Sequence, residues 1–138
     1  MEYQMQKVWA LLIGYAFGNL LTAEIVVRRL TGKSVSAYGT GNPGMANVMH
    51  IFGLKAGLTV LGGDLLKTLV SCLIAGFCFG GSSGRIILLY AGLGTTLGHN
   101  FPVWHGFRGG KGVATTCGAL FLFSPLYGLA ACLAGLAA

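Results

Sequence analysis

The chain has 138 residues, of which 54% are hydrophobic and only 9% are charged, and its formal net charge is +6. A soluble domain carries about 25% charged residues. This composition therefore excludes a soluble globular domain, because the chain has too few charged residues to cover a water-facing surface. We expect an all-α, polytopic transmembrane helix bundle. The positive charges lie mostly between apolar runs, so they predict membrane topology and favour anionic lipids or small anionic substrates over nucleic acid.

Four apolar runs follow one another along the chain. They cover residues 8–27, 56–80, 86–104 and 113–138. Each is close to the roughly 20 residues that a helix needs to cross the hydrocarbon core, so we expect a single membrane domain, 1–138, with about four spans. The first run is interpreted as an anchor, not a cleaved signal, because it is long and Arg28 and Arg29 follow it.

The basic residues predict how the spans are oriented. The loop 28–55 carries four Lys or Arg residues and no acid, the loop 105–112 carries two, and the turn 80–85 carries one. An excess of Lys and Arg marks the cytoplasmic side of a membrane. We therefore expect both loops in the cytoplasm, and the N-terminus, the 80–85 turn and the C-terminus outside.

The loop 28–55 contains the stretch GTGNPGMAN. Its Asn-Pro and Pro-Gly pairs favour turns, and closely spaced glycines let successive backbone N–H groups face one concavity, which suits an anion. The glycines are Gly39, Gly41 and Gly44, and the polar side chains are those of Thr40, Asn42 and Asn47. An ordinary turn at the membrane surface is the alternative interpretation.

The second loop leads into the last apolar run through the stretch FRGGKGVAT, residues 107–115. It combines Arg108, the pair Gly109 and Gly110, the point charge of Lys111, and Gly112 before an expected helix. A helix N-terminus has free N–H groups and a dipole that favour an anion, so the stretch is a candidate phosphate cradle. The alternative is a flexible basic hinge.

The same stretch does not match the nucleotide-binding P-loop. That motif needs Ser or Thr after its lysine and a glycine five residues before its second glycine. Gly112 and His105 stand at these positions, so nucleotide hydrolysis is not inferred.

Several polar residues lie inside or beside the apolar runs. Asp64 and Lys67 are three residues apart, so they share one helix face and pair there, either structurally or in a substrate cavity. His99 is a candidate site residue, and the alternative interpretation is a packed or interfacial histidine. Glu24 and Arg28 are expected to form a surface pair.

The four cysteines all fall in apolar runs, and they are interpreted as small buried residues. Together with the three histidines they show no metal-ligand spacing. No metal site is expected.

The motifs GTGNPGMANV, GDLLKT, GHNFPV and GGKGVAT occur in this order along the chain. Together they resemble the bacterial acyl-phosphate:glycerol-3-phosphate acyltransferase family of the PlsY type, whose pattern is similar to G-S/T-G-N-x-G-A/S-x-N, D-x-x-K, G-H-x-F-P and G-G-K-G-V-A. The matching positions are Gly39, Thr40, Gly41, Asn42, Gly44, Asn47, Asp64, Lys67, Gly98, His99, Phe101, Pro102 and 109–114. Outside residues 39–115, the chain matches the family by hydropathy only.

The resemblance implies a multi-pass inner-membrane enzyme, usually with seven spans, an outside N-terminus and active-site loops in the cytoplasm. It implies transfer of a fatty acyl chain from acyl phosphate to the sn-1 hydroxyl of glycerol 3-phosphate, which gives lysophosphatidic acid for phospholipid synthesis. No cofactor is implied. The implied partners are the two substrates, membrane lipids and the enzyme that produces acyl phosphate, and nucleic acid is not among them.

The resemblance also implies roles for particular residues. The phosphate site is Arg108, Gly109, Gly110, Lys111 and Gly112; the catalytic residues are Thr40, Asn42 and His99; the supporting residues are Gly39, Gly41, Gly44, Asn47, Asp64 and Lys67. No Ser or Cys nucleophile is needed, because acyl phosphate is already an activated mixed anhydride.

The chain departs from the family pattern at three places. Ser36 stands where the family has an arginine, Thr40 stands for its serine, and the family's last spans and third motif have no counterpart. These departures indicate a divergent or C-terminally truncated member. The alternative function is that of a catalytically impaired paralogue or fragment that binds a phosphorylated ligand or a partner at the membrane.

Overall fold

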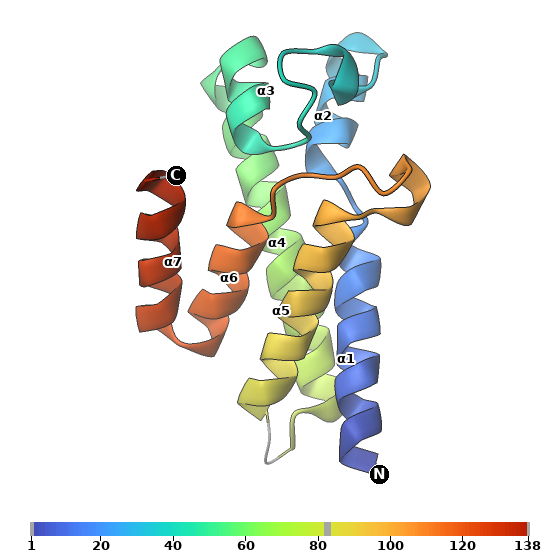
Figure 1. The fold of residues 1–138 in the computed structure, drawn as a ribbon, viewed down its shortest axis with the longest axis vertical. Helices are drawn as coiled ribbons and strands as arrows, with labels where there is room; N and C mark the ends of the chain where they lie inside the picture. Colours follow the sequence, from blue (N-terminus) through green and yellow to red (C-terminus); the bar gives the residue numbers. More distant parts are fainter. Residues whose placement is uncertain (1, 82–83, 138) are drawn as a thin grey trace.

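The computed structural model describes residues 2–81 and 84–137. Ser82 and Ser83 of the expected outward turn, and Ala138 at the end of the last apolar run, lie outside the described residues. The described residues contain helices and no strand. In chain order they are α1 Glu2–Gly18, α2 Thr22–Thr31, η1 Val35–Ala37, α3 Met45–Phe52, α4 Leu54–Phe79, α5 Gly84–Asn100, η3 Val103–His105, α6 Val113–Phe123 and α7 Pro125–Ala137 (Figure 1).

Helices α1, α4 and α5 lie side by side along the long axis, and the pair α6 and α7 packs beside them (Figure 1). Within the described residues, two segments are long and apolar enough to cross a membrane, Glu2–Thr31 with 30 residues and Leu54–Phe79 with 26. At about 1.5 Å per residue, α4 is longer than the roughly 30 Å hydrocarbon core. The expected all-helical architecture is confirmed.

Glycines let α1 and α5 approach closely. Gly14 and Gly18 on α1 face Gly94 and Gly98 on α5, and a Cβ atom at any of them would overlap backbone atoms of the other helix. Small residues spaced four apart are typical of helix packing in membranes, where close van der Waals contact replaces the hydrophobic effect. This contact holds α5 at a fixed depth against α1.

The first apolar run is not one continuous helix as expected. Helix α1 ends at Gly18 and α2 begins at Thr22, which leaves backbone carbonyls free in an apolar setting. The ammonium group of Lys67 donates hydrogen bonds to the carbonyls of Leu20 at 2.7 Å and Gly18 at 3.4 Å. A buried polar group without a partner is costly, so this lysine stabilises the break.

The last apolar run is also two helices, and not the one continuous helix expected over 113–138. Ser124 is extended, with φ −157° and ψ 122°, because a residue before proline disfavours the helical region. Helices α6 and α7 have 11 and 13 residues. At about 1.5 Å per residue, α6 is shorter than the hydrocarbon core.

The two short helices form an antiparallel hairpin. Gly128 packs against Phe121, and Gly135 lies beside Val113. Figure 1 shows α7 running back toward the end of the molecule that carries α2 and α3. The number of membrane crossings and the sides on which the two ends lie stay predictions.

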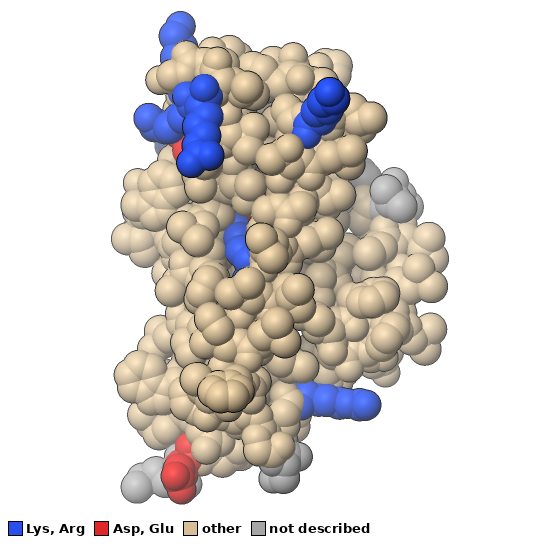
Figure 2. Space-filling model, turned by 180° about the vertical axis from the view of Figure 1, so that it is seen from behind, with Lys and Arg blue, Asp and Glu red and all other residues tan. Residues whose placement is uncertain are grey.

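The loops 28–55 and 105–112 lie at the same end of the bundle, opposite to the N-terminus (Figure 1). Lys and Arg side chains gather at this end, above a broad tan surface (Figure 2). The glycine-rich motifs, far apart in sequence, are thus brought to one place.

Candidate active site

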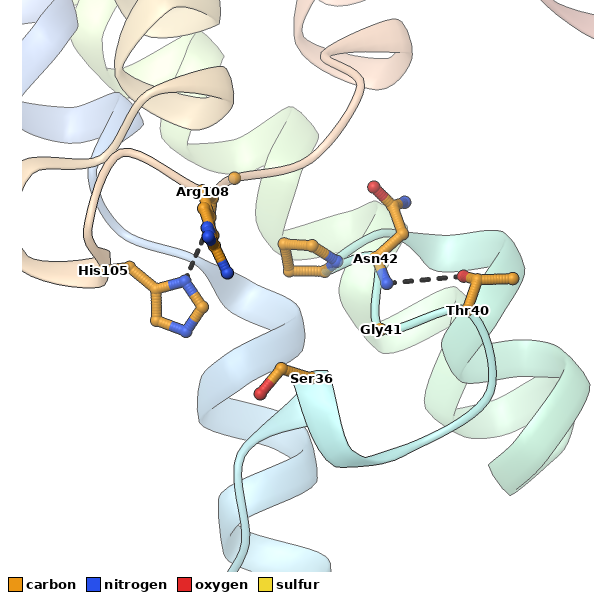
Figure 3. Close-up of a pocket in the computed structure, with 8 residues that line it drawn as sticks. Ser36, Thr40, Gly41, Asn42, His105 and Arg108 are labelled. Atoms are coloured by element: carbon orange, nitrogen blue, oxygen red, sulfur yellow. Dashed lines mark hydrogen bonds between the residues drawn. The ribbon is translucent and has the colours of Figure 1, made fainter.

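A pocket of about 500 Å³ lies between these two loops (Figure 3). Its lining residues are Ser36, Thr40, Gly41, Asn42, Pro43, His105, Arg108 and Gly109. One wall comes from the GTGNP stretch and η1, and the other comes from the loop that follows α5. Five of the expected site residues therefore meet at one surface, and they are Thr40, Gly41, Asn42, Arg108 and Gly109.

Asn47 on α3 holds the first wall in shape. Its side-chain oxygen accepts a hydrogen bond from the Thr40 N–H at 3.0 Å, and its amide nitrogen donates to the carbonyls of Tyr38 and Asn42 at 3.1 Å each. Its burial, at 7% exposure, makes these bonds costly to lose. The expected supporting role of Asn47 thus has a physical basis in loop geometry.

Two glycines in this wall have left-handed backbone. Gly39 has φ +54° and Gly41 has φ +75°, a region that favours glycine. A Cβ at Gly39 would also overlap the Asn47 side chain. Gly44, the third expected glycine, precedes α3 with φ −135° and donates its N–H to the Asn42 carbonyl at 2.9 Å.

The paired glycines of the second loop hold that loop against the end of α5. The Gly109 N–H donates to the Asn100 carbonyl at 3.0 Å, and the Gly110 N–H donates to the His99 carbonyl at 3.0 Å. A Cβ at Gly110 would overlap the His99 ring. In this conformation these two N–H groups face protein carbonyls instead of an anion, so the pair anchors the loop.

The charged residues of the second loop take different positions. The Arg108 guanidinium extends into the space between the walls (Figure 3), and within the described chain it has no ion-pair partner. Lys111 is exposed and does not line the pocket. Gly112, with φ +73°, caps the start of α6 beside Asn100.

His105 lines the pocket and was missed as a site residue from sequence. Its Nδ1 lies 2.7 Å from the Arg108 carbonyl, which closes a tight turn (Figure 3). Gly106 and Phe107, inside this turn, both have positive φ, 64° and 58°. The only available sequence signal was a titratable residue within a basic, glycine-rich loop.

Asp64, Lys67 and His99 form a buried cluster in the bundle and do not line the pocket. Lys67 Nζ lies 2.9 Å from Asp64 Oδ1 and 2.9 Å from His99 Nδ1. Thr22 adds a hydrogen bond to Asp64 at 3.1 Å. All three clustered side chains are at most 5% exposed. The Asp64–Lys67 pair is thus buried inside the bundle, and its role in the site stays a prediction.

Glu24 was expected at the surface, and the structure buries it. The pair with Arg28 is present, but Glu24 is 1% exposed while the Arg28 side chain is 57% exposed. The carboxylate accepts hydrogen bonds from the Ser34 hydroxyl at 3.0 Å and the Val35 N–H at 2.9 Å. A buried carboxylate needs such donors, and the loop that follows α2 folds back to supply them.

Among the described residues, no three His, Cys, Asp or Glu side chains are grouped to hold a metal ion. Cys72 and Cys117 are buried, Cys132 is partly buried and Cys78 is exposed.

These features define a membrane-embedded helical bundle that presents a basic pocket between two glycine-rich loops. The chain belongs to the glycerol-3-phosphate acyltransferase family, whose sequence model matches residues 8–138. It is 47% identical over 132 residues to glycerol-3-phosphate acyltransferase 1 of Lactobacillus johnsonii, covering 96% of this chain and 63% of the relative. It is 38% identical over 121 residues to the Aquifex aeolicus glycerol-3-phosphate acyltransferase, covering 88% and 62%.

Two solved structures of PlsY, an integral membrane glycerol 3-phosphate acyltransferase, resemble this fold at 36% identity. The lysophosphatidic acid form has a TM-score of 0.72 and covers 89% of this chain and 59% of that chain. The glycerol 3-phosphate form has a TM-score of 0.68, with coverages of 94% and 61%. The chain thus spans about three fifths of the length of the relatives that it matches.

Proposed function

We propose that this chain transfers a fatty acyl group from acyl phosphate to the sn-1 hydroxyl of glycerol 3-phosphate. The observation that carries the proposal is the pocket that residues of both glycine-rich loops line together at one end of an apolar bundle. The family and the glycerol 3-phosphate form of PlsY support the choice of acceptor. An interfacial pocket suits one apolar and one water-soluble substrate.

The chemistry asks little of the protein beyond positioning and charge. The acceptor hydroxyl oxygen attacks the acyl carbonyl carbon, the bond from that carbon to the phosphate oxygen breaks, and the hydroxyl proton leaves with the released phosphate. Both substrates are anionic, so the Arg108 guanidinium offsets their repulsion and binds a phosphate group. Thr40 and Asn42 supply polar groups on the opposite wall, where they orient the reacting carbonyl.

The other expected residues support this surface from behind. We assign Gly109 and Gly110 to anchoring the second loop, and the Asp64, Lys67 and His99 cluster to fixing the depth of α5 and the α1–α2 break. Lys111 and the free N–H groups that begin α6 add positive potential beside the pocket.

We further propose that the bundle is a multi-pass protein of the inner membrane, with the N-terminus outside and the pocket facing the cytoplasm. The cluster of Lys and Arg at the pocket end supports this orientation (Figure 2). The pocket then opens toward the compartment that contains glycerol 3-phosphate. It also lies within reach of the enzyme that supplies acyl phosphate.

Acyl transfer from palmitoyl phosphate to labelled glycerol 3-phosphate, measured with the purified chain in detergent or a lipid mesophase, tests the proposal. Arg108→Gln should lower kcat/KM for glycerol 3-phosphate about 10- to 100-fold, because a hydrogen bond to a charged group contributes about 1.5–3 kcal/mol. Arg85→Gln is the matched control, since Arg85 is exposed near the start of α5, at the other end of the bundle. Binding of glycerol 3-phosphate without turnover would instead favour a protein that only binds a phosphorylated ligand. Equal losses of activity in both variants would argue against a role of the pocket in acyl transfer.

A further inference from the structure

The break between α1 and α2 leaves three backbone carbonyls that no further turn of helix can satisfy. The ammonium group of Lys67 donates to the first and the third, those of Gly18 and Leu20. The middle one, the Asn19 carbonyl, accepts a hydrogen bond from Nε1 of Trp104 at 2.6 Å. Trp104 lies in the loop that follows α5 and forms the second wall of the pocket, so the break is bonded both to α4 and to that loop.

The Asn19 side chain makes a second contact with this loop. Its Oδ1 accepts a hydrogen bond from the Val103 N–H at 2.8 Å, and its Nδ2 donates to the Tyr15 carbonyl at 2.7 Å. Because an N–H can only donate and a carbonyl can only accept, these partners fix which way the amide points. The Tyr15 hydroxyl adds a bond to the Phe101 carbonyl at 2.7 Å. The end of α1 and the break thus hold the first residues of the loop by three hydrogen bonds.

The other end of the loop is held by different bonds, and Arg108 lies between the two anchors. The N–H groups of Gly109 and Gly110 bond to the last carbonyls of α5. Inside the loop, the Phe107 N–H donates to the Pro102 carbonyl at 2.9 Å, which closes the turn from which the Arg108 guanidinium extends between the walls (Figure 3). Without the first anchor, this turn would be held on one side only. An anion would then have to order the loop as it binds, which lowers the affinity.

We propose that Asn19 is a positioning residue for Arg108, because it holds the start of this loop on the α1–α2 break. Asn19 is not among the residues that line the pocket, so it acts through the loop and not on a substrate. The inference rests on the proposed function, in which Arg108 binds a phosphate group, and it deepens that function by naming what fixes the guanidinium. It also gives the break in the first apolar run a part in the reaction.

Three substitutions separate the bonds that Asn19 makes. Asn19→Leu keeps the side-chain volume nearly constant and removes both bonds of the amide. Asn19→Asp keeps an acceptor for the Val103 N–H and loses the donor to the Tyr15 carbonyl. Trp104→Phe keeps an aromatic ring and removes the bond to the Asn19 carbonyl. Trp9→Phe is the matched control, because Trp9 is exposed in the first half of α1 and lies outside the pocket lining.

Calorimetric titration of the full chain with glycerol 3-phosphate, in detergent, measures the affinity without acyl transfer. Asn19→Leu should weaken binding about tenfold, Asn19→Asp and Trp104→Phe should each weaken it by less, and Trp9→Phe should leave it unchanged. Hydrogen–deuterium exchange should become faster at the Val103 N–H in Asn19→Leu, while the Gly110 N–H stays protected because its bond to α5 remains.

A double substitution shows whether Asn19 acts through Arg108. In a chain that already carries Arg108→Gln, Asn19→Leu should weaken binding by no more than about twofold, because the guanidinium that it places is absent. Acyl-transfer kinetics give a second readout, since Asn19→Leu should raise KM for glycerol 3-phosphate and leave KM for acyl phosphate nearly unchanged. A purely structural defect would instead lower the active fraction, and so kcat, with both KM values unchanged.

Unchanged affinity in Asn19→Leu, or the same loss with and without Arg108→Gln, would overturn the inference. Should Asn19→Leu not fold, Asn19→Asp and Trp104→Phe decide it by the same comparison. The two proposals fail in different ways. Binding that depends on Asn19 without any turnover contradicts the proposed function alone, and turnover with an affinity that Asn19 does not affect contradicts this inference alone.

Discussion

The ammonium group of Lys67 donates a hydrogen bond to the Leu20 carbonyl at 2.7 Å, across 47 residues of chain. This bond joins the middle of α4 to the break between α1 and α2. The same ammonium group lies 2.9 Å from the Asp64 carboxylate, so one buried cation satisfies an acid and a helix end together. The break in the first apolar run therefore depends on a residue of the second.

Replacing Lys67 with Met should destabilise the bundle by about 3–5 kcal/mol, because it leaves the Asp64 charge buried and unpaired. The free energy of unfolding can be measured by titration with SDS in mixed micelles, followed by circular dichroism. Lys55→Met is the matched control, since Lys55 is exposed at the start of α4. Similar unfolding curves for the two variants would show that the buried cluster contributes little.

The close approach of α1 and α5 predicts that a Gly→Ala substitution has different effects inside this contact, at Gly98, and outside it, at Gly62. Gly98→Ala should destabilise the protein by about 1–3 kcal/mol, because the new Cβ would overlap the Tyr15 carbonyl and the Gly18 backbone. Gly62→Ala should be neutral or stabilise by up to about 1 kcal/mol, since Gly62 faces open space on α4. The same SDS titration compares them, and equal effects would contradict the close approach.

Asn47→Ala should release the GTGNP wall of the pocket. It removes three hydrogen bonds, each contributing about 0.5–1.5 kcal/mol. We expect faster amide exchange at Thr40, measured by hydrogen–deuterium exchange, and a loss of acyl transfer of about tenfold or more. Asn47→Asp keeps the acceptor for Thr40 but loses both donors, so an effect as large as that of Ala would assign the main role to the donors.

Lys111→Ala tests whether the exposed lysine contributes through its charge. Because Lys111 lies beside the pocket and not in its lining, we expect KM for glycerol 3-phosphate to rise a few-fold, with the larger loss belonging to Arg108→Gln. KM for acyl phosphate should change less. Lys33→Ala is the control, as Lys33 is exposed and outside the pocket lining. An equal loss for both substrates would argue against a role in binding the acceptor phosphate.

Local pattern predicted the class of protein and most of the helices. The run 56–80 corresponds to α4, and the run 86–104 corresponds to α5 with the turn after it. The break at Ser124 has a local signal in Pro125, because a residue before proline disfavours the helical region. Hydropathy, from which the continuous run 113–138 was predicted, does not carry this signal. The break after Gly18 also has a local signal in the Gly18–Asn19 pair, because Gly and Asn favour helix ends. The ammonium group that stabilises the break comes from Lys67 on another helix.

Sequence by itself determined that the chain is an all-helical membrane protein with two glycine-rich, basic loops, and the order of their motifs marked the family. It did so because hydropathy and turn chemistry are local properties of the chain. Only the tertiary structure decided which motif residues meet. It placed Thr40 and Asn42 opposite Arg108, buried His99 with Lys67, and brought Glu24 behind His105. Burial and pairing arise from contacts between segments distant in sequence, and no local pattern carries that information.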